Sequence, residues 1–424
     1  MVRRQWQRLG GVRPNAHDRP PASAWRALFW ITAAELLAMS VWFSASAVTG
    51  ALAQQWHLSG LAITGLTAVV QVGFVVGALI SATLGLADRV RPRQLMAWGA
   101  LGAAATTVAI LAFPDGGWAP FALRTLTGVC LAVVYPVAVQ WVAAWFPRQR
   151  GLAVGILIGG LTVGSALPRL LVGLPFLHLW PAVLAGSAAL AVVSWALVLW
   201  VVPEHPGPFR PPAFRWDRVG AVLRDGPVMW ANLGYWGHMW ELYAMWTWLP
   251  VFLLAAAAPH WTGATLVRRA GWTAFGAIGL AGVAGALAGG WAADRWGRTR
   301  ATIGAMAVSG AMAVVIGFTY HAALWITTVV SLIWGFSVIA DSAQFSAAVT
   351  ELSPQELQGS ALTLQMAVGF LLTIGSINLV GWLEPTVGWT HILAILAIGP
   401  AVGIWAMVRL RQRPESLRMA HGRR

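Results

Sequence analysis

The feature that most constrains this sequence is a succession of apolar runs, each long enough to cross a membrane as a helix, separated by short polar connections. A hydrocarbon core of about 30 Å takes about 20 helical residues to cross, and the runs are too long for barrel strands. They predict twelve transmembrane helices, at 27–50, 61–84, 95–113, 118–145, 152–176, 180–202, 228–256, 271–293, 301–320, 323–349, 359–383 and 389–410.

The composition agrees with this interpretation. The 424 residues are 58% hydrophobic and only 10% charged, whereas a soluble domain carries about 25% charged residues. Most of the surface must therefore face lipid, and the fold class predicted is an all-α polytopic membrane protein.

The net charge of +14 raises the alternative of a nucleic-acid partner, which the placement of the charge argues against. All 28 basic residues are arginines, and 24 of them fall on one side of the membrane in the twelve-helix arrangement. The positive-inside rule then predicts two cytoplasmic termini in a bacterial-type inner membrane, and no nucleic-acid partner. Cys130 is the only cysteine, so no intrachain disulfide is expected.

An internal repeat divides the chain. Glu35 to Trp42 reads Glu-Leu-Leu-Ala-Met-Ser-Val-Trp, and Glu241 to Trp248 reads Glu-Leu-Tyr-Ala-Met-Trp-Thr-Trp, at an offset of 206 residues. Asp88 and Asp294, each followed by an arginine, are also 206 residues apart. Six helices separate the copies, which predicts two pseudo-symmetric six-helix bundles with the same orientation.

The Pro- and Arg-rich stretch between the copies reads as a linker. The predicted organisation is a cytoplasmic tail, an N-terminal bundle, a cytoplasmic linker, a C-terminal bundle and a second cytoplasmic tail, at 1–24, 25–202, 203–226, 227–410 and 411–424.

Two motifs resemble those of the major facilitator superfamily. Gly290 to Arg298 reads Gly-Trp-Ala-Ala-Asp-Arg-Trp-Gly-Arg, similar to the family's cytoplasmic loop motif, and the earlier copy keeps only Asp88-Arg89. Arg124 and Gly128 match a second motif, Arg-x-x-x-Gly. The resemblance covers the whole chain and implies the major facilitator fold, with gating by charged residues at the loop motifs, namely Asp88, Arg89, Asp294, Arg295 and Arg298.

The run from Gly151 to Pro168 is distantly similar to the nitrate and cyanate porters. Nitrate porters, however, hold the anion with arginines in their second and eighth helices, and residues 61–84 and 271–293 contain no charge. Nitrate transport is therefore not favoured, and the substrate stays unassigned.

Charged residues inside a membrane need a reason, because each costs about 2.5–3.5 kcal/mol at the bilayer centre. Glu35 and Glu241 are the strongest candidates for a functional site, because each is the first in a stripe of several residues whose spacing places them on one face of a helix. A carboxyl in such a site can bind and release a proton, although a structural hydrogen bond is the alternative. The stripes also place two tryptophans toward the cavity, Trp42 and Trp248.

Four further residues are candidates for binding or coupling. His238 lies three residues before Glu241 and could relay a proton or simply pack, Asp341 and Gln344 form a polar patch, and Arg124 could pair with a carboxylate. His-x-x-Glu has no further ligands around it, so no metal site and no cofactor are predicted.

These observations predict a monomeric secondary transporter that carries a small solute by alternating access, coupled to protons. The resemblance places the first, fourth, seventh and tenth helices around the cavity. Four of the five charged residues inside the predicted helices lie on these four, namely Glu35, Arg124, Glu241 and Asp341. The alternative is a non-transporting solute sensor or assembly factor on the same scaffold. No enzyme motif is present in the sequence.

Overall fold

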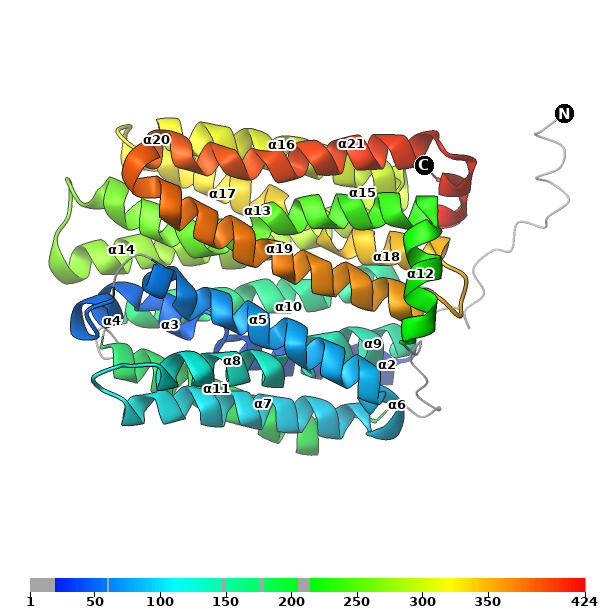
Figure 1. The fold of residues 1–424 in the computed structure, drawn as a ribbon, viewed down its shortest axis with the longest axis horizontal. Helices are drawn as coiled ribbons and strands as arrows, with labels where there is room; N and C mark the ends of the chain where they lie inside the picture. Colours follow the sequence, from blue (N-terminus) through cyan, green and yellow to red (C-terminus); the bar gives the residue numbers. More distant parts are fainter. Residues whose placement is uncertain (1–19, 59–60, 147–149, 175–178, 205–213, 424) are drawn as a thin grey trace, which may run out of the picture.

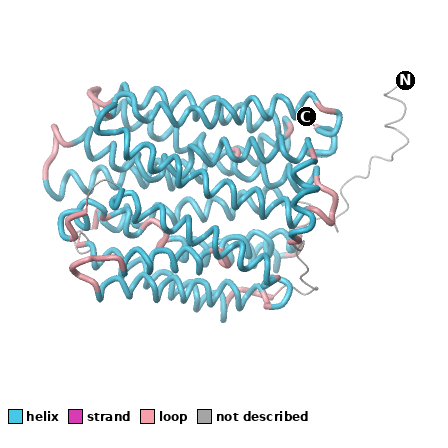
Figure 2. The backbone as a smooth tube through the Cα atoms, viewed as in Figure 1, coloured by secondary structure: helices cyan, strands magenta, loops and turns pink. Residues whose placement is uncertain are grey.

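The computed structural model describes residues 20–58, 61–146, 150–174, 179–204 and 214–423, and these form a bundle of long helices without strands (Figures 1 and 2). The predicted tail up to residue 19 and the linker residues 205–213 lie outside this part of the chain. Among the described residues, eleven helical stretches are long and apolar enough to cross a membrane.

The first predicted span, 27–50, is the twelfth member of the bundle. It is formed by α2 (Ala22–Met39), then a turn at 40–43, then α3 (Ser44–Ala47) and α4 (Thr49–Gln55). Arg26 and Glu35 make α2 less apolar than the other spans, and it packs against two of them, α10 (Arg150–Val172) and α11 (Trp180–Trp200). The prediction of an all-helical membrane fold is confirmed.

The two sequence repeats form the two bundles of the molecule (Figure 1). The remaining elements of the first are α5 (Leu61–Leu84), α6 (Leu86–Arg89), α7 (Pro92–Ala109), α8 (Ala119–Leu131) and α9 (Tyr135–Trp145). The second contains α13 (Gly226–Ala257), α14 (Gly263–Phe275), α15 (Gly282–Trp296), α16 (Arg298–Phe318), α17 (Leu324–Ala340), α18 (Ser342–Leu352), α19 (Gln358–Val387), α20 (Trp389–Ile392) and α21 (Ile398–Gln412).

Several spans are interrupted, and these breaks position polar groups. The fourth span, predicted as continuous over 118–145, is broken between α8 and α9, where Tyr135 begins the second segment. The tenth span is broken at Asp341, between α17 and α18. The first span breaks at 40–43. Unwound turns leave backbone groups and side chains available at mid-membrane, where binding sites of transporters lie.

Close contacts between helices depend on small residues. A Cβ at Gly289 of α15 would lie 1.7 Å from the carbonyl oxygen of Ala340, and one at Gly285 would lie 1.9 Å from that of Phe336. Only glycine permits this approach of α15 to α17. Between the bundles, α5 packs along α19, and α10 packs along α14 and α15.

One end of the molecule carries the start of α2, α6, the helix α12 (Trp216–Arg224) and residues 414–423, and we call it the basic end. Residues 414–422 form a 3-10 helix that packs on α18, with Met419 fully buried and the amide of Ala420 donating to Glu351 Oε2 at 3.1 Å. The predicted C-terminal tail is therefore held against the C-terminal bundle.

Candidate functional site

Glu241 is buried inside the C-terminal bundle and accepts two hydrogen bonds. The hydroxyl of Ser309 on α16 donates to Oε2 at 2.8 Å, and the indole Nε1 of Trp334 on α17 donates to Oε1 at 2.7 Å. The carboxylate thus points toward helices of its own bundle. The gap-facing side of α13 is instead formed by Tyr243 and Trp246, which contact rings of the other bundle.

His238 and Asp341 form a buried pair beside Glu241. His238 Nδ1 lies 2.8 Å from Asp341 Oδ1, and the two side chains are 1% and 2% exposed. Asp341 is available for this contact because it stands at the break between α17 and α18, where its side chain makes no cap hydrogen bond. The rings of Tyr235 and Phe345 flank the histidine at 6.0 and 5.6 Å.

Glu35 is fully buried in α2, yet neither of its carboxylate oxygens has a hydrogen-bond partner among the described residues. Tyr135 on α9 and Tyr243 on α13 of the other bundle lie within range of a charge on this carboxylate. Met39 and Trp42, the other members of its predicted stripe, are also buried, and Trp42 lies in the gap between the bundles.

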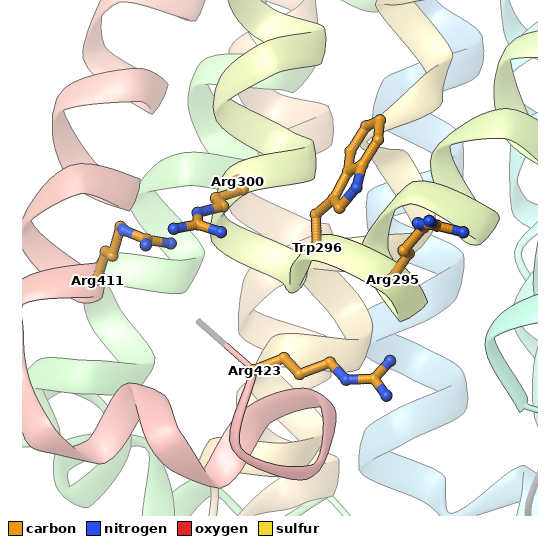
Figure 3. Close-up of a pocket in the computed structure, with 5 residues that line it drawn as sticks. All are labelled: Arg295, Trp296, Arg300, Arg411 and Arg423. Atoms are coloured by element: carbon orange, nitrogen blue, oxygen red, sulfur yellow. The ribbon is translucent and has the colours of Figure 1, made fainter.

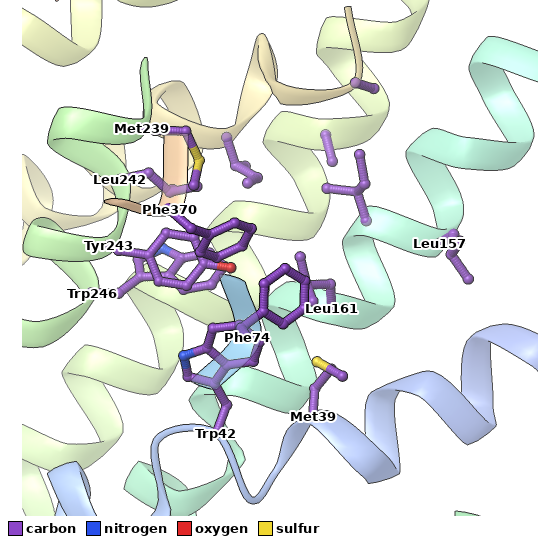
Figure 4. Packing of buried hydrophobic residues seen from close by; sticks show 14 of the residues in the cluster. Met39, Trp42, Phe74, Leu157, Leu161, Met239, Leu242, Tyr243, Trp246 and Phe370 are labelled. Atoms are coloured by element: carbon purple, nitrogen blue, oxygen red, sulfur yellow. The ribbon is translucent and has the colours of Figure 1, made fainter. Parts of the chain in front are cut away.

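Six aromatic rings lie at the centre of the molecule between the bundles, and we call them the central aromatic cluster. Figure 4 labels all of them except Phe43. Trp42 lies 5.6 Å from Tyr243 and 5.7 Å from Phe370 between ring centroids, and Phe74 lies 4.3 Å from Phe370. Aromatic pairs at these separations attract beyond simple burial. The members from the N-terminal bundle are Trp42, Phe43 and Phe74, and those from the C-terminal bundle are Tyr243, Trp246 and Phe370.

Arg124 is fully buried and stabilises the break in the first span. Its guanidinium donates to the carbonyl oxygens of Val41, at 2.8 Å, and Trp42, and its Nε donates to that of Leu66 at 3.3 Å. The carboxylate partner that the sequence suggested is absent from these contacts. The break frees carbonyl groups that an arginine can satisfy, so backbone recognition explains the burial of this charge.

Trp248 packs away from the central aromatic cluster. Its indole Nε1 donates to the carbonyl oxygen of Ile377 on α19 at 3.0 Å, and its ring lies 6.1 Å from that of Trp389. Its predicted place in the solute cavity stays a prediction, whereas Trp42 does reach the gap.

The gating candidates meet at the basic end. Arg298 binds both carboxylate oxygens of Glu351, at 2.8 and 2.6 Å, and donates to Gln344 Oε1 at 2.6 Å. Gln344 is thereby bound to the motif arginine, and among the described residues its side chain forms no hydrogen bond with that of Asp341.

Asp294 lies across from the start of α10 in the other bundle. A Cβ at Gly151 would be 3.6 Å from Asp294 Oδ1. Arg295 stacks over Trp291 at 5.5 Å, and Arg89 is exposed at the end of α6. The side chain of Asp88 lies outside the described residues, so its gating role stays a prediction.

The sequence interpretation missed Ser309, Trp334 and three tyrosines. The tyrosines could have been noticed because tyrosine is rare in this sequence. The chain has only four tyrosines, and three of these lie on the fourth and seventh predicted spans. Ser309 and Trp334 carried no signal, since serines and tryptophans are common in this chain. Among the described residues no three His, Cys, Asp or Glu side chains gather as a metal site.

Comparison with known proteins identifies the family. The model of the Major Facilitator Superfamily matches residues 30–377. The chain belongs to the Major Facilitator Superfamily. This confirms the resemblance seen in the motifs, and because the superfamily consists of transporters it also confirms that the chain is not an enzyme. The similarity to nitrate and cyanate porters stays a prediction.

Two relatives of this superfamily member are named for small aromatic acids. The gallate transporter of Pseudomonas putida is 23% identical over 361 residues, which cover 76% of this chain and 77% of that protein. The gentisate transporter of Corynebacterium glutamicum is 24% identical over 351 residues, which cover 79% and 76%. Among solved structures, a mutant of the nucleoside transporter NupG has a TM-score of 0.69 and 14% identity, covering 91% of this chain and 99% of that one. This last likeness concerns the fold alone.

Proposed function

We propose that this superfamily member is a proton-coupled secondary transporter of a small solute, in which Glu35 carries the coupling proton. The observation that supports it best is the buried carboxyl of Glu35, which has no hydrogen-bond partner among the described residues. An ionised carboxylate in such a dry site is costly, so the closed arrangement favours a protonated acid. Opening the site to water favours release of that proton.

The way the two bundles meet supports transport by alternating access. Residues 25–202 and 227–410 act as the two moving bodies, and the central aromatic cluster is the contact that separates when the site opens. Both bundles contribute rings to this cluster, and Tyr243 lies across the gap within range of a charge on Glu35. Rocking of one bundle against the other would therefore change the surroundings of the acid.

His238, Asp341 and Glu241 form the second polar group of the proposed site. The pair of His238 and Asp341 is proposed to relay the proton, because an imidazole has two ring nitrogens, each of which can hold a hydrogen. The transporter is proposed to act as a monomer.

The basic end is proposed to face the cytoplasm of an inner membrane, with both termini on that side. The distribution of arginines supports this orientation. The two exceptions at the opposite end, Arg268 and Arg269, lie over the rings of Trp272 and Trp261 at 5.8 and 4.4 Å, which suits the membrane–water boundary.

The test is transport by purified protein in liposomes, with radiolabelled gallate and gentisate as the first probes, followed by anions, organic cations and amino acids that stabilise the protein thermally. An imposed pH gradient should drive accumulation by the wild type. Glu35→Gln should abolish accumulation but keep solute exchange, because the amide cannot release a proton.

The matched control is Glu204→Gln, the same chemical change at a half-exposed surface ion pair with Arg93. It should accumulate solute like the wild type. Full gradient-driven accumulation by Glu35→Gln would overturn the coupling role of this acid. Solute binding without exchange in the wild type would instead favour the sensor alternative.

A further inference from the structure

An open cavity of about 270 Å³ lies at the basic end of the C-terminal bundle (Figure 3). Four arginines and one tryptophan line it, drawn from three separate parts of the chain. Arg295 and Trp296 end α15, Arg300 begins α16, Arg411 ends α21, and Arg423 follows the C-terminal 3-10 helix. The lining therefore carries four positive charges and no acid.

Three arginines at this end form ion pairs with carboxylates. Arg93 lies 3.5 Å from Glu204, Arg215 lies 2.8 Å from Asp217, and Arg298 lies 2.6 Å from Glu351. Within the described part of the chain, the cavity residues Arg295, Arg300 and Arg423 form no such pair.

Two of the cavity arginines have contacts with neutral groups. Arg423 donates to the backbone carbonyl of Asp294, and the guanidinium of Arg295 lies over the ring of Trp291. These contacts hold Arg423 and Arg295 without cancelling their charge. Like charges gathered around one cavity repel, and an anion bound among them would remove that repulsion.

We propose that this cavity binds the phosphate group of an anionic phospholipid headgroup. Guanidinium groups match phosphate oxygens with two parallel hydrogen bonds, and basic sites beside membrane helices on the cytoplasmic side recognise such headgroups. Trp296 and Trp291 favour a lipid over a soluble phosphate. They are 50% and 56% exposed and meet edge to face at 5.5 Å between ring centroids, and exposed tryptophans are enriched at the membrane–water boundary.

A bound headgroup would join the C-terminal segment to the gating motif. Arg423 already bonds to Asp294, whose carboxylate lies against the start of α10 in the other bundle. The lipid would add an ionic link between Arg423 and the arginines of α15 and α16. Anionic lipid thereby stabilises the closed basic end.

The experiment measures lipid binding by the purified full chain in neutral detergent, by native mass spectrometry and thermal unfolding. Dioleoylphosphatidylglycerol should bind and raise the unfolding temperature, and dioleoylphosphatidylcholine should not. The double variant Arg300→Gln/Arg423→Gln should weaken the apparent affinity by about fivefold for each arginine removed. A control, Arg26→Gln/Arg224→Gln, removes two exposed charges from the same end outside the cavity and should bind like the wild type.

Each other outcome overturns the lipid assignment. Equal weakening in the two double variants would show that only the overall charge matters. Stabilisation by millimolar inorganic phosphate without stabilisation by phosphatidylglycerol would assign the cavity to a soluble anion. Absence of binding by either ligand to the wild type would remove the site altogether.

Discussion

Glu241 accepts hydrogen bonds on both carboxylate oxygens, whereas Glu35, at the matching position of the other repeat, accepts none among the described residues. Both side chains are buried, at 1% and 0% exposure. Burial is therefore equal and hydrogen bonding is what differs. Ser309 and Trp334, which hold Glu241, are the source of that difference.

The counterparts of these donors follow from the repeat. At the offset of 206 that separates the two glutamates, Ser309 corresponds to Ala103 and Trp334 corresponds to Gly128. Neither residue has a polar side chain, so the N-terminal bundle offers no equivalent donors. The two halves have kept the acid and changed its neighbours.

The same offset relates the ion pair to two neutral residues. His238 corresponds to Thr32, and Asp341 corresponds to Tyr135. Asp341 and Tyr135 both stand at the break of their span, so the repeat conserves the backbone feature while the chemistry differs. One half holds its acid in a polar network, and the other buries its acid without a hydrogen-bond partner among the described residues. Substitutions in each half can test this difference between the two acids.

The largest effect is expected from breaking the ion pair of the C-terminal bundle. Asp341→Ala leaves His238 buried without its partner, and loss of one member of a buried pair costs about 3–5 kcal/mol. Chemical unfolding in detergent measures this loss. Adding His238→Leu should recover part of it, because the unpaired group is then removed. A double variant less stable than Asp341→Ala would show that the pair is not the unit that matters.

The second-largest effect is the loss of stability expected when each of the two acids is replaced by its amide. Glu241→Gln offers one carbonyl oxygen where Ser309 and Trp334 now find two acceptors, which should cost about 1–3 kcal/mol. Glu35→Gln loses no hydrogen bond and should change stability by much less. Unfolding of both variants under the same conditions gives the comparison. Equal losses would contradict the difference between the half-sites.

The fold was accessible from the sequence for simple reasons. Length and apolarity decide whether a helix spans a membrane, and the offset between Glu35 and Glu241 defined the two halves before any coordinates. The breaks inside the membrane spans could not be predicted from the sequence. Asp341 ends its helix without a proline or glycine beside it, and tertiary contacts such as that with His238 hold the break.

The site was accessible only in part. Intramembrane charge identified Glu35, Glu241 and Asp341 as buried, but charge does not tell which way a side chain points. The spacing of Trp248 predicted a place toward the gap, which stays a prediction, and it carried no signal for the hydrogen bond that the indole donates to the carbonyl oxygen of Ile377 on α19. The partners of Arg124 depended on the break in the first span, which hydropathy does not report.

The smallest effect comes from giving Glu35 the donor that its counterpart has. Ala103 is fully buried on α7 at the position equivalent to Ser309. Ala103→Ser adds one hydroxyl, and a hydrogen bond to the carboxylate should stabilise the protein by about 0.5–1.5 kcal/mol. The same bond favours the ionised acid, so accumulation driven by a pH gradient should weaken while exchange continues. Ala100→Ser, one turn earlier on the same helix and also buried, is the control and should leave coupling unchanged. If Ala103→Ser were less stable and fully coupled, the hydroxyl would not reach Glu35, and the repeat would not predict the neighbours of this acid.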